Sequence, residues 1–493
     1  MDVVLRELVI GLDMGTTSVK VVIFDLKGKL ITQTEELITT SYPKSDWAEQ
    51  NPNEIEKACI LAMKNAISEL NKSQDKVLAV GISAAMHSLI CIDEEMDPLS
   101  PVMIWSDKRS SQIAEKLIAT NDEEIYSKTG TPIHPMTPFL KLIWLREENL
   151  KAYQNASYFM SMKEYLVQKW FGKRMIDYSM ASATGLFNAK ELKWERSALK
   201  LAGIKEEQLS EVVPPTEILI GLTESVAQEI GLSPDTPFVI GAADGQLANL
   251  GSGAIEPGEV NISVGTSGAI RQFVKGAPIN HKMETFTYAF TEDTSIIGGA
   301  TNNGGIALEW FKDLIEYEGS YDDLLILANK IEIGADGLIF IPYINGERAP
   351  LWNGRAKGNF YGLSINHKKE HLIRAVLEGI ALNLYHISQS LEEIAGPPKK
   401  ITVNGGLSKS ETWVQIMADI LGKKIYLSDT HHNAAWGAAW TALVGIRKVQ
   451  SFAEIKSNLP DERVIEPNME NHKAYIPVFE KYERLVETLK AFF

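Results

Sequence analysis

The sequence predicts an α/β protein in which two related domains face a common cleft. Its 493 residues exceed what one hydrophobic core usually serves, so two or three domains are expected. A strand, a tight polar turn and a second strand occupy residues 8–26, and the same pattern returns at residues 259–272. Because a chance polar turn need not recur at an equivalent place, the repeat indicates duplication of a whole domain.

The amino-acid composition limits which classes of partner the protein can bind and which cellular compartment suits it. Apolar residues make up 45% of the chain and charged residues 23%, which is ordinary for a globular protein. The net charge of −15, without a basic run, argues against nucleic acid or an anionic membrane as a partner. Only Cys59 and Cys91 are present, so we expect no disulfide framework and a reducing compartment. No signal-peptide or membrane-spanning pattern is recognisable, and a soluble cytoplasmic protein is expected.

The first strand pair has a tip suited to binding an anion. The apolar runs Leu8–Leu12 and Val19–Phe24 flank it. Gly15 has no Cβ, so a bulky anion can approach the backbone there. Lys20 supplies a cation, and Asp13 can hold a metal ion. The hydroxyl and backbone N–H donors come from Thr16, Thr17 and Ser18. The simpler interpretation of this segment is a hairpin with a polar turn.

The second strand pair repeats this chemistry in the other half of the chain. Gly265, Thr266 and Ser267 correspond in kind to the first tip, and two tips that face one cleft would grip a polyphosphate from both sides. Between the two repeats, a predicted strand at residues 238–241 leads to Asp244. An acid just past the carboxyl end of an α/β strand is where such folds place chemistry. The alternative is a turn aspartate before glycine.

A helix is predicted over residues 52–70. Asn51 is a suitable N-cap, Pro52 suits the first helical position, and apolar residues follow at helical spacing. The residues just before the positive end of this helix include Trp47, Glu49 and Gln50. A loop with a packed tryptophan is the simpler interpretation of those three residues.

Two polar segments follow predicted strands in the first half. A strand at residues 77–83 leads to Met86 and His87, and the segment IWSDKR at residues 104–109 follows later. The aromatic and charged residues of interest in the IWSDKR segment are Trp105, Asp107 and Arg109. Such a mixture suits polyol recognition, because hydroxyls need donors and acceptors while C–H faces stack on rings. The alternative for His87 is a structural histidine. The alternative for residues 104–109 is a surface loop with an ion pair.

Further elements are predicted from local patterns. Residues 141–148 and 157–170 are expected to be helical, and residues 177–188 to form a polar loop around a ligand or another backbone. Residues 371–394 have the pattern of a long amphipathic helix. The tail from about residue 446 is expected to be helical and peripheral.

A second glycine-rich junction lies near residue 405. A strand at Ile401–Val403 is followed by Gly405-Gly406, and Ser408 with Glu411 has the spacing of a capping box that opens the next helix. Such a junction allows close approach of the backbone to a flat ligand such as adenosine. A plain connector between strand and helix is the alternative.

The motifs that are absent narrow the chemistry. The sequence contains no G-x-x-x-x-G-K-[ST] loop, protein-kinase signature set, G-x-S-x-G motif or zinc-protease spacing. Asp13, Lys20 and Asp244, together with two hydroxyl-rich tips, suit phosphoryl transfer, which requires mostly positioning and charge stabilisation.

The chain resembles the FGGY carbohydrate kinases of the actin-like ATPase superfamily, in motifs that follow family order over nearly its whole length. The matching segments are DMGTTS at 13–18, MTPFLKLIWL at 136–145, GAADG around Asp244, GTS at 265–267, GNFYGL at 358–363, HLIRAVLE at 371–378, and Gly405-Gly406. This resemblance implies two duplicated actin-like, ribonuclease H-like domains with a central cleft. Residues 1–247 would bind the sugar and carry the first phosphate hairpin, whereas residues 248–493 would bind ATP and end in the helical tail.

The resemblance also implies roles for individual residues. Asp244 would be the catalytic base, and Asp13 and Asp244 would bind Mg²⁺. The implied ATP-binding residues are Gly15, Thr16, Thr17, Ser18, Lys20, Gly265, Thr266, Ser267, Gly305, Gly405, Gly406 and Ser410. The implied sugar-binding residues are Glu49, Gln50, Met86, His87, Trp105, Asp107 and Arg109. The expected partners are therefore ATP and a small sugar or sugar acid, and a homodimer is left open.

The sugar is indicated mainly by Met86-His87. Glycerol kinases carry an Arg-Glu pair there, whereas the xylulose and gluconate branches share Met-His. The segments at residues 85–88, 104–109 and 181–188 resemble gluconate kinases most, which implies conversion of D-gluconate to 6-phosphogluconate. His87, Arg109 or Lys141 could then face the carboxylate. The alternatives are xylulokinase or another FGGY pentulose or polyol kinase, a non-catalytic actin-like ATP-binding protein, and a sugar-binding regulator without phosphoryl transfer.

Overall fold

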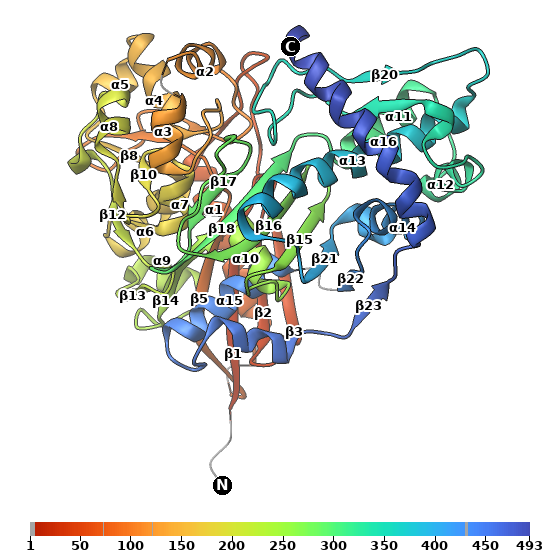
Figure 1. Ribbon diagram of the computed structural model, residues 1–493. Helices are drawn as coiled ribbons and strands as arrows, with labels where there is room; N and C mark the ends of the chain where they lie inside the picture. Colours follow the sequence, from red (N-terminus) through yellow and green to blue (C-terminus); the bar gives the residue numbers. More distant parts are fainter. Residues whose placement is uncertain (1–4, 72, 121, 429–431) are drawn as a thin grey trace.

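The computed structural model describes residues 5–71, 73–120, 122–428 and 432–493. Two large sheets form the centre of the molecule, with helices between them and around them, so the predicted α/β fold is confirmed (Figure 1). Within the described residues, no helix is both long enough and apolar enough to cross a membrane.

The first sheet contains the first predicted hairpin. Its central strand β1 pairs with β2 in antiparallel fashion and with β5 in parallel fashion. The strand order across the sheet is β13 (Ile218–Leu219), β14 (Phe238–Ala243), β5 (Asp75–Ala84), β1 (Arg6–Met14), β2 (Ser18–Asp25) and β3 (Leu30–Leu37).

The second sheet repeats this topology. The hairpin β15–β16 is antiparallel, β18 adds to β16, and β21 and β22 run parallel to β15, as β5 and β14 do to β1. The strand order is β17 (Phe286–Ala289), β18 (Thr294–Thr301), β16 (Gly268–Lys275), β15 (Glu259–Val264), β21 (Lys400–Asn404), β22 (Ile425–Ser428) and β23 (Glu462–Ile465). The duplication predicted from the two tips is therefore visible in the connectivity of five strands.

Two helices join the halves at the centre of Figure 1, α10 (Asp244–Gly251) and α15 (Asn433–Gly445). The helix α15 lies directly on the first sheet, although it belongs to the last part of the chain. A Cβ on Gly11 of β1 would lie 2.0 Å from the carbonyl oxygen of Ala435, so this contact needs glycine. The pairing of α10 with α15 is equally close, because a Cβ on Gly437 would lie 2.0 Å from the Leu247 oxygen.

The remaining elements surround the sheets. Helices of the first half are α1 (Pro52–Ser68), α2 (Ser111–Ile118), α3 (Asp122–Thr129), α4 (Pro138–Glu147), α5 (Lys151–Gln154), α6 (Met162–Phe171), α7 (Tyr178–Ala183), α8 (Arg196–Ala202) and α9 (Glu224–Ile230). Helices of the second half are α11 (Gly305–Leu314), α12 (Tyr321–Ala328), α13 (Lys369–Ala395), α14 (Glu411–Leu421) and α16 (Met469–Leu489). Short strand pairs are β4 (Glu49–Gln50) with β7 (Val102–Met103), β6 (Ile90–Ile92) with β8 (Tyr158–Met160), β9 (Met175–Asp177) with β12 (Glu211–Val213), β10 (Phe187–Asn188) with β11 (Lys193–Trp194), and β19 (Ile339–Ile341) with β20 (Asn359–Tyr361).

Several local predictions are confirmed. The helix α1 begins at Pro52, and the side chain of Asn51 accepts a hydrogen bond from the backbone N–H of Asn53. The strand predicted over 77–83 is the central part of β5, and the helix predicted over 371–394 is α13.

Four local predictions are wrong, each because a tertiary contact or a neighbouring cap overrides the local pattern. Residues 158–160 form β8, which pairs with β6, before the helix begins at Met162. The expected loop at 177–188 contains α7, because Asp177 caps it. The helix α14 is capped by Ser410, and Ser408 instead donates to the Gly405 carbonyl. The tail is not wholly helical, since it adds β23 to the edge of the second sheet.

Candidate active site

A cavity of about 370 Å³ lies between the two halves, next to both predicted tips. Thr16, Met86, His87, Trp105 and Asp244 of the first half line it. Its lining from the second half includes Gly265, Thr266, Ser267, Arg271, Tyr288, Arg348 and Trp352. Residues separated by more than 300 positions in the sequence thus surround one space.

Hydrogen bonds from neighbouring segments fix the first tip. The Gln50 amide donates to the carbonyl of Thr16 at 2.7 Å, and the Trp105 indole N–H donates to its hydroxyl at 3.0 Å. The hydroxyl of Ser18 donates to Glu35 at 2.6 Å, so this predicted phosphate donor is directed away from the cavity. Gln50 therefore braces the tip through its amide N–H groups, the second of which goes to Thr40.

Asp13 and Lys20 lie directly opposite one another on β1 and β2. The Ser83 hydroxyl donates to Asp13 at 2.7 Å, and burial raises the pKa of the Asp13 carboxyl. Lys20 lies 3.6 Å from Glu35, and Lys20 is partly exposed. Within the described residues, no group of three or more acidic, histidine or cysteine side chains could hold a metal ion. A cation at Asp13 would therefore draw its other ligands from a phosphate and water, as Mg²⁺ commonly does.

Asp244 is the first residue of α10 and follows β14 directly, so its carboxylate stands at the carboxyl edge of the first sheet. Burial raises the pKa of Asp244 to about 6, and the nearby charge of Asp13 adds to this, while Arg271 opposes it. The Asp244 carboxylate also accepts a hydrogen bond from the backbone N–H of Gly245 at 2.7 Å. A carboxylate of this kind is partly protonated near pH 6 and can accept a proton at neutral pH.

The second tip is held through its backbone. The N–H of Gly305, at the start of α11, donates to the Gly265 carbonyl at 2.7 Å, and Ile306 donates to Thr266 at 3.1 Å. A Cβ on Gly304 would lie 2.6 Å from the Ser267 oxygen, so a larger residue would displace the tip. Gly265 and Thr266 are exposed, which leaves their outward donors accessible to a ligand.

His87 is a neutral acceptor toward the cavity. Its Nδ1 lies 2.7 Å from the carbonyl oxygen of Ala183, which can only accept, so Nδ1 carries the proton and Nε2 has a free lone pair. Burial lowers the pKa of His87 to about 3. The ring also meets that of Tyr288 edge-on at 6.2 Å. A neutral imidazole can accept a sugar hydroxyl, but it cannot offer a positive charge to a carboxylate.

Lys141 does not face the cavity. It is fully buried, and its ammonium group donates to the carbonyl oxygens of His87, Met103 and Ile104 at 2.7, 3.2 and 2.8 Å. Burial lowers the pKa of Lys141 to about 7. It therefore ties together the two segments that carry the predicted sugar-binding residues.

Glu49, Asp107 and Arg109 bind one another. Arg109 donates to Asp107 at 2.7 Å and to Glu49 at 2.6 Å, and its guanidinium lies 3.9 Å from the centre of the Trp47 ring. Asp107 is fully buried and also accepts from the backbone N–H of Ala48. The structure brings these three predicted residues together, but their charged groups are paired and none of them lines the cavity.

The predicted adenosine junction follows β21. Gly405 has a positive φ of 95°, and a Cβ there would lie 2.5 Å from the Val264 oxygen at the end of β15. Ser410 accepts from the N–H of Trp413 at 3.1 Å, which caps α14. Gly405 and Gly406 are exposed, so the backbone is open beside the second tip.

Among the lining residues that sequence reasoning missed, three carry polar groups that matter for the chemistry, Arg271, Tyr288 and Arg348. One signal was available for Arg271, because it is a charged residue inside the apolar strand that follows the second tip. Tyr288 and Arg348 come from β17 and from an irregular segment, and their approach depends on the tertiary fold.

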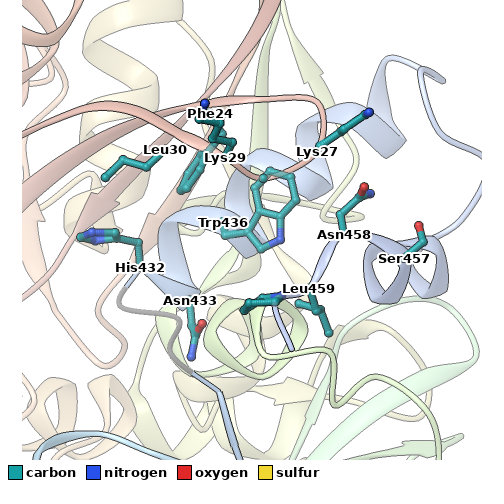
Figure 2. A pocket seen from close by; sticks show the side chains of 12 residues that line it. Phe24, Lys27, Lys29, Leu30, His432, Asn433, Trp436, Ser457, Asn458 and Leu459 are labelled. Carbon is teal, nitrogen blue, oxygen red and sulfur yellow. The ribbon is translucent and has the colours of Figure 1, made fainter. Parts of the chain in front are cut away.

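A second hollow, of about 580 Å³, lies at the other end of β2 (Figure 2). Phe24 and Trp436 form its apolar part, with their ring centres 5.0 Å apart, and Lys27 and Lys29 stand at its edge. None of the described residues that line it carries a carboxylate. The described lining of this hollow therefore lacks a carboxylate base such as Asp244 in the cavity between the tips.

Comparison with known proteins agrees with this geometry. Residues 8–251 match the N-terminal domain of the FGGY family of carbohydrate kinases, and residues 260–446 match its C-terminal domain. The chain is 39% identical to a gluconokinase of Bacillus subtilis (strain 168), over 97% of this chain and 96% of that protein.

Two solved structures are also very similar. The crystal structure of gluconate kinase from Lactobacillus acidophilus superposes with a TM-score of 0.95 at 31% identity, covering 98% of each chain. A ligand-bound xylulose kinase from the same organism gives the same TM-score and identity, over 98% of this chain and 99% of that one. The two domain matches and the near-complete overlap show that the chain belongs to the FGGY family of carbohydrate kinases.

Proposed function

We propose that this kinase transfers a phosphoryl group from ATP to D-gluconate and forms 6-phosphogluconate. The observation that carries the proposal is a cavity that combines Asp244 with two arginines, in a chain 39% identical to a gluconokinase. A neutral sugar would need the carboxylate but not the arginines. The shape of the fold does not select the sugar, since a xylulose kinase superposes equally well.

The two halves would divide the work. Residues 1–247 would carry the first tip and most of the sugar-binding residues, and residues 248–493 would bind ATP and contribute Arg271 and Arg348 to the cavity wall. Both tips adjoin the cavity, and the open junction at Gly405-Gly406 lies beside the second tip, which supports placing adenosine there. The ATP phosphates would then lie between Thr16 and Thr266.

Asp244 would accept the proton of the attacking hydroxyl. Its raised pKa, about 6, makes it a better base than an ordinary carboxylate while leaving it mostly ionised at neutral pH. Its position at the first turn of α10 fixes the direction of the hydroxyl. We expect this proton transfer and orientation to contribute roughly 10²–10⁴-fold to the rate.

Asp13 would hold Mg²⁺, directly or through water, and Asp244 lies close enough for the two charges to influence one another. Carboxylate oxygen is the ligand that Mg²⁺ prefers, and bound Mg²⁺ would neutralise charge on the phosphates. Lys20 and the donors of the tips would stabilise the charge on the transferred group. Closure of the two halves would exclude water from the cavity.

The sugar would contact Met86, His87 and Trp105. The Nε2 atom of His87 would accept a hydroxyl, and the Trp105 ring would cover a C–H face. Glu49, Gln50, Asp107 and Arg109 would act from behind this surface, because their polar atoms are bonded to the protein.

A coupled kinase assay against gluconate, xylulose, ribulose and glycerol tests the function. We expect ATP turnover that depends on added sugar and is highest with gluconate. A clear preference for a neutral ketose would favour xylulokinase, the second candidate, which the matching xylulose kinase structure supports. ATP turnover that depends strictly on added sugar would exclude a non-catalytic ATP-binding role, whereas ATP binding without phosphorylation of any of these sugars would favour that role. We also propose a cytoplasmic location, because both cysteines are free thiols. A homodimer is a further proposal, and a measurement of molecular mass in solution tests it.

A further inference from the structure

One wall of the cavity holds polar groups that have no partner in the protein. The guanidinium of Arg271 forms no hydrogen bond or ion pair with any residue that the structure describes, and its Nε is buried. The Nε of Arg348 and the hydroxyl of Tyr288 are also buried and unpartnered. Burying such donors is costly unless a hydrogen-bond acceptor meets them, so the wall is built for a ligand that accepts.

The duplicated fold shows how unusual Arg271 is at its position. Arg271 pairs with Asn261 in the second hairpin, as Val22 pairs with Gly11 in the first. Val22 is 1% exposed and packs in an apolar core. One repeat therefore places a hydrophobic residue where the other places an unpaired cation, which a purely structural role does not explain.

The nearby acids do not satisfy these donors. Glu347 is fully buried, and its oxygens accept from Thr301, Asn303, Asn383 and two backbone N–H groups, so it is committed elsewhere. Among the residues that the structure describes, the Arg348 guanidinium donates to the Thr301 carbonyl alone.

The charge of Asp244 acts to raise the pKa of Arg271, but the two side chains form no ion pair. The helix α10 leaves room for the guanidinium only because residue 245 is glycine, since a Cβ there would lie 2.8 Å from its Nε.

The wall adjoins residues that the proposed function assigns to the sugar, namely Trp105 and His87. Arg271 follows Ser267 by four residues along β16, which places its backbone roughly 13 Å beyond the tip at the usual rise of a strand. Arg348 lies 5.1 Å from the centre of the Trp105 ring, and its charge acts on His87. Tyr288 contacts the His87 ring edge-on.

We propose that Arg271, Tyr288 and Arg348 bind the carboxylate of the substrate and thereby select an acyclic sugar acid over a neutral sugar of the same length. A guanidinium presents a planar fork of donors that matches a carboxylate. The tyrosine hydroxyl adds a third donor. This inference rests on the proposed function, because it assumes that the cavity binds the sugar.

The test compares two ligands that differ at one carbon. D-glucitol carries a CH₂OH group where D-gluconate carries the carboxylate. Binding of each to the full-length protein is measured by calorimetry without ATP, for the wild type and for Arg271→Gln, Arg348→Gln and Tyr288→Phe. We expect each arginine variant to bind gluconate about 10- to 10²-fold more weakly, and Tyr288→Phe several-fold more weakly, because charged hydrogen bonds are lost. Glucitol affinity should change by less than about threefold.

Control measurements distinguish a variant that has lost gluconate binding from one that has lost its folded structure. Binding of a non-hydrolysable ATP analogue and the thermal midpoint report whether each variant is folded. Arg271→Lys keeps the charge and should recover part of the gluconate affinity. Arg484→Gln removes an arginine from the exposed side of α16 and should leave gluconate binding unchanged.

Three results would overturn the assignment. Equal losses for gluconate and glucitol would show a structural role. A fall in kcat with unchanged gluconate affinity would show that the arginines act on phosphoryl transfer. A wild type that binds only neutral sugars would reject both this inference and the proposed function. A wild type that binds another sugar acid, with the same dependence on the arginines, would support the inference and reject gluconate alone.

Discussion

Both hairpins have an antiparallel ladder, but their tips differ in length and in side chains, since residues 15–18 form the first tip and residues 265–267 the second. In the first hairpin the last two pairs are Asp13 with Lys20 and Met14 with Val19. In the second they are Ser263 with Ala269 and Val264 with Gly268. The first tip therefore has a charged pair at a position where the second has two small uncharged residues.

The tips also differ in how they are supported. Side chains of Gln50, Trp105 and Glu35 hold the first tip, whereas backbone N–H groups at the start of α11 hold the second. Both copies keep a polar turn that begins with glycine, whereas the charged pair to which we assign a part in catalysis, Asp13 with Lys20, belongs to the first hairpin and has no counterpart in the second. Asp244 fits this division, since it also belongs to the first half.

The largest effect is expected from Asp244→Asn, which removes the base but keeps its size. We expect kcat to fall roughly 10²–10⁴-fold, because the hydroxyl loses its proton acceptor. Steady-state kinetics on the folded variant measures this. Near wild-type turnover would show that Asp244 is not the base, and Asp244 would then no longer support the proposed catalytic difference between the two halves.

Asp13→Ser gives the first hairpin the residue that the second has. We expect kcat/KM to fall on the order of 10²-fold at low Mg²⁺ and to recover partly as Mg²⁺ is raised, because a carboxylate ligand is lost. Activity is measured across a series of Mg²⁺ concentrations. The reciprocal variant, Ser263→Asp, serves as the control and should not restore activity in the Asp13→Ser background. Rescue by Ser263→Asp would mean that the two tips are interchangeable.

The pH profile gives a third test of the same asymmetry. In the proposed mechanism Asp244 acts as a carboxylate, so protonation below its pKa of about 6 should remove activity. We expect kcat/KM to be about tenfold lower at pH 5 than on the plateau. Because Asp13 raises this pKa, the acid limb should move to lower pH in Asp13→Ser. An acid limb that stays in place would show that the two carboxylates are not coupled.

Much of the scaffold could be predicted from sequence, because strands, caps and tips depend on local patterns. Asn51, the two tips and the acid at the end of β14 are examples. Directions of side chains could not be predicted. An ion pair between Asp107 and Arg109 is one interpretation of their segment, but sequence spacing does not reveal that the pair is buried and does not line the cavity. Arg348 reaches the cavity only through the tertiary fold.

The second tip can be disturbed through its backbone alone. In Gly304→Ala the new Cβ would meet the Ser267 oxygen at 2.6 Å, so the tip must move. We expect the KM for ATP to rise about tenfold and the KM for gluconate to change little, since misplaced groups can lose this much affinity. Gly354→Ala is the matched control, because a Cβ there meets nothing within 4 Å. Equal changes in both KM values would show a general loss of structure.

The smallest effect is expected from Ser18→Ala. The Ser18 hydroxyl donates to Glu35, whereas the Thr16 hydroxyl adjoins the cavity. Loss of the Ser18 bond should lower stability by about 1 kcal/mol and leave the KM for ATP within about twofold. Thr16→Val, which removes a hydroxyl of the cavity, should raise the KM for ATP several-fold more. Thermal unfolding and ATP titrations on both variants measure the difference. If Ser18→Ala raised the KM as much as Thr16→Val, Ser18 would have to turn from Glu35 to the phosphates when ATP binds, and the first tip would be less rigid than its side-chain supports indicate.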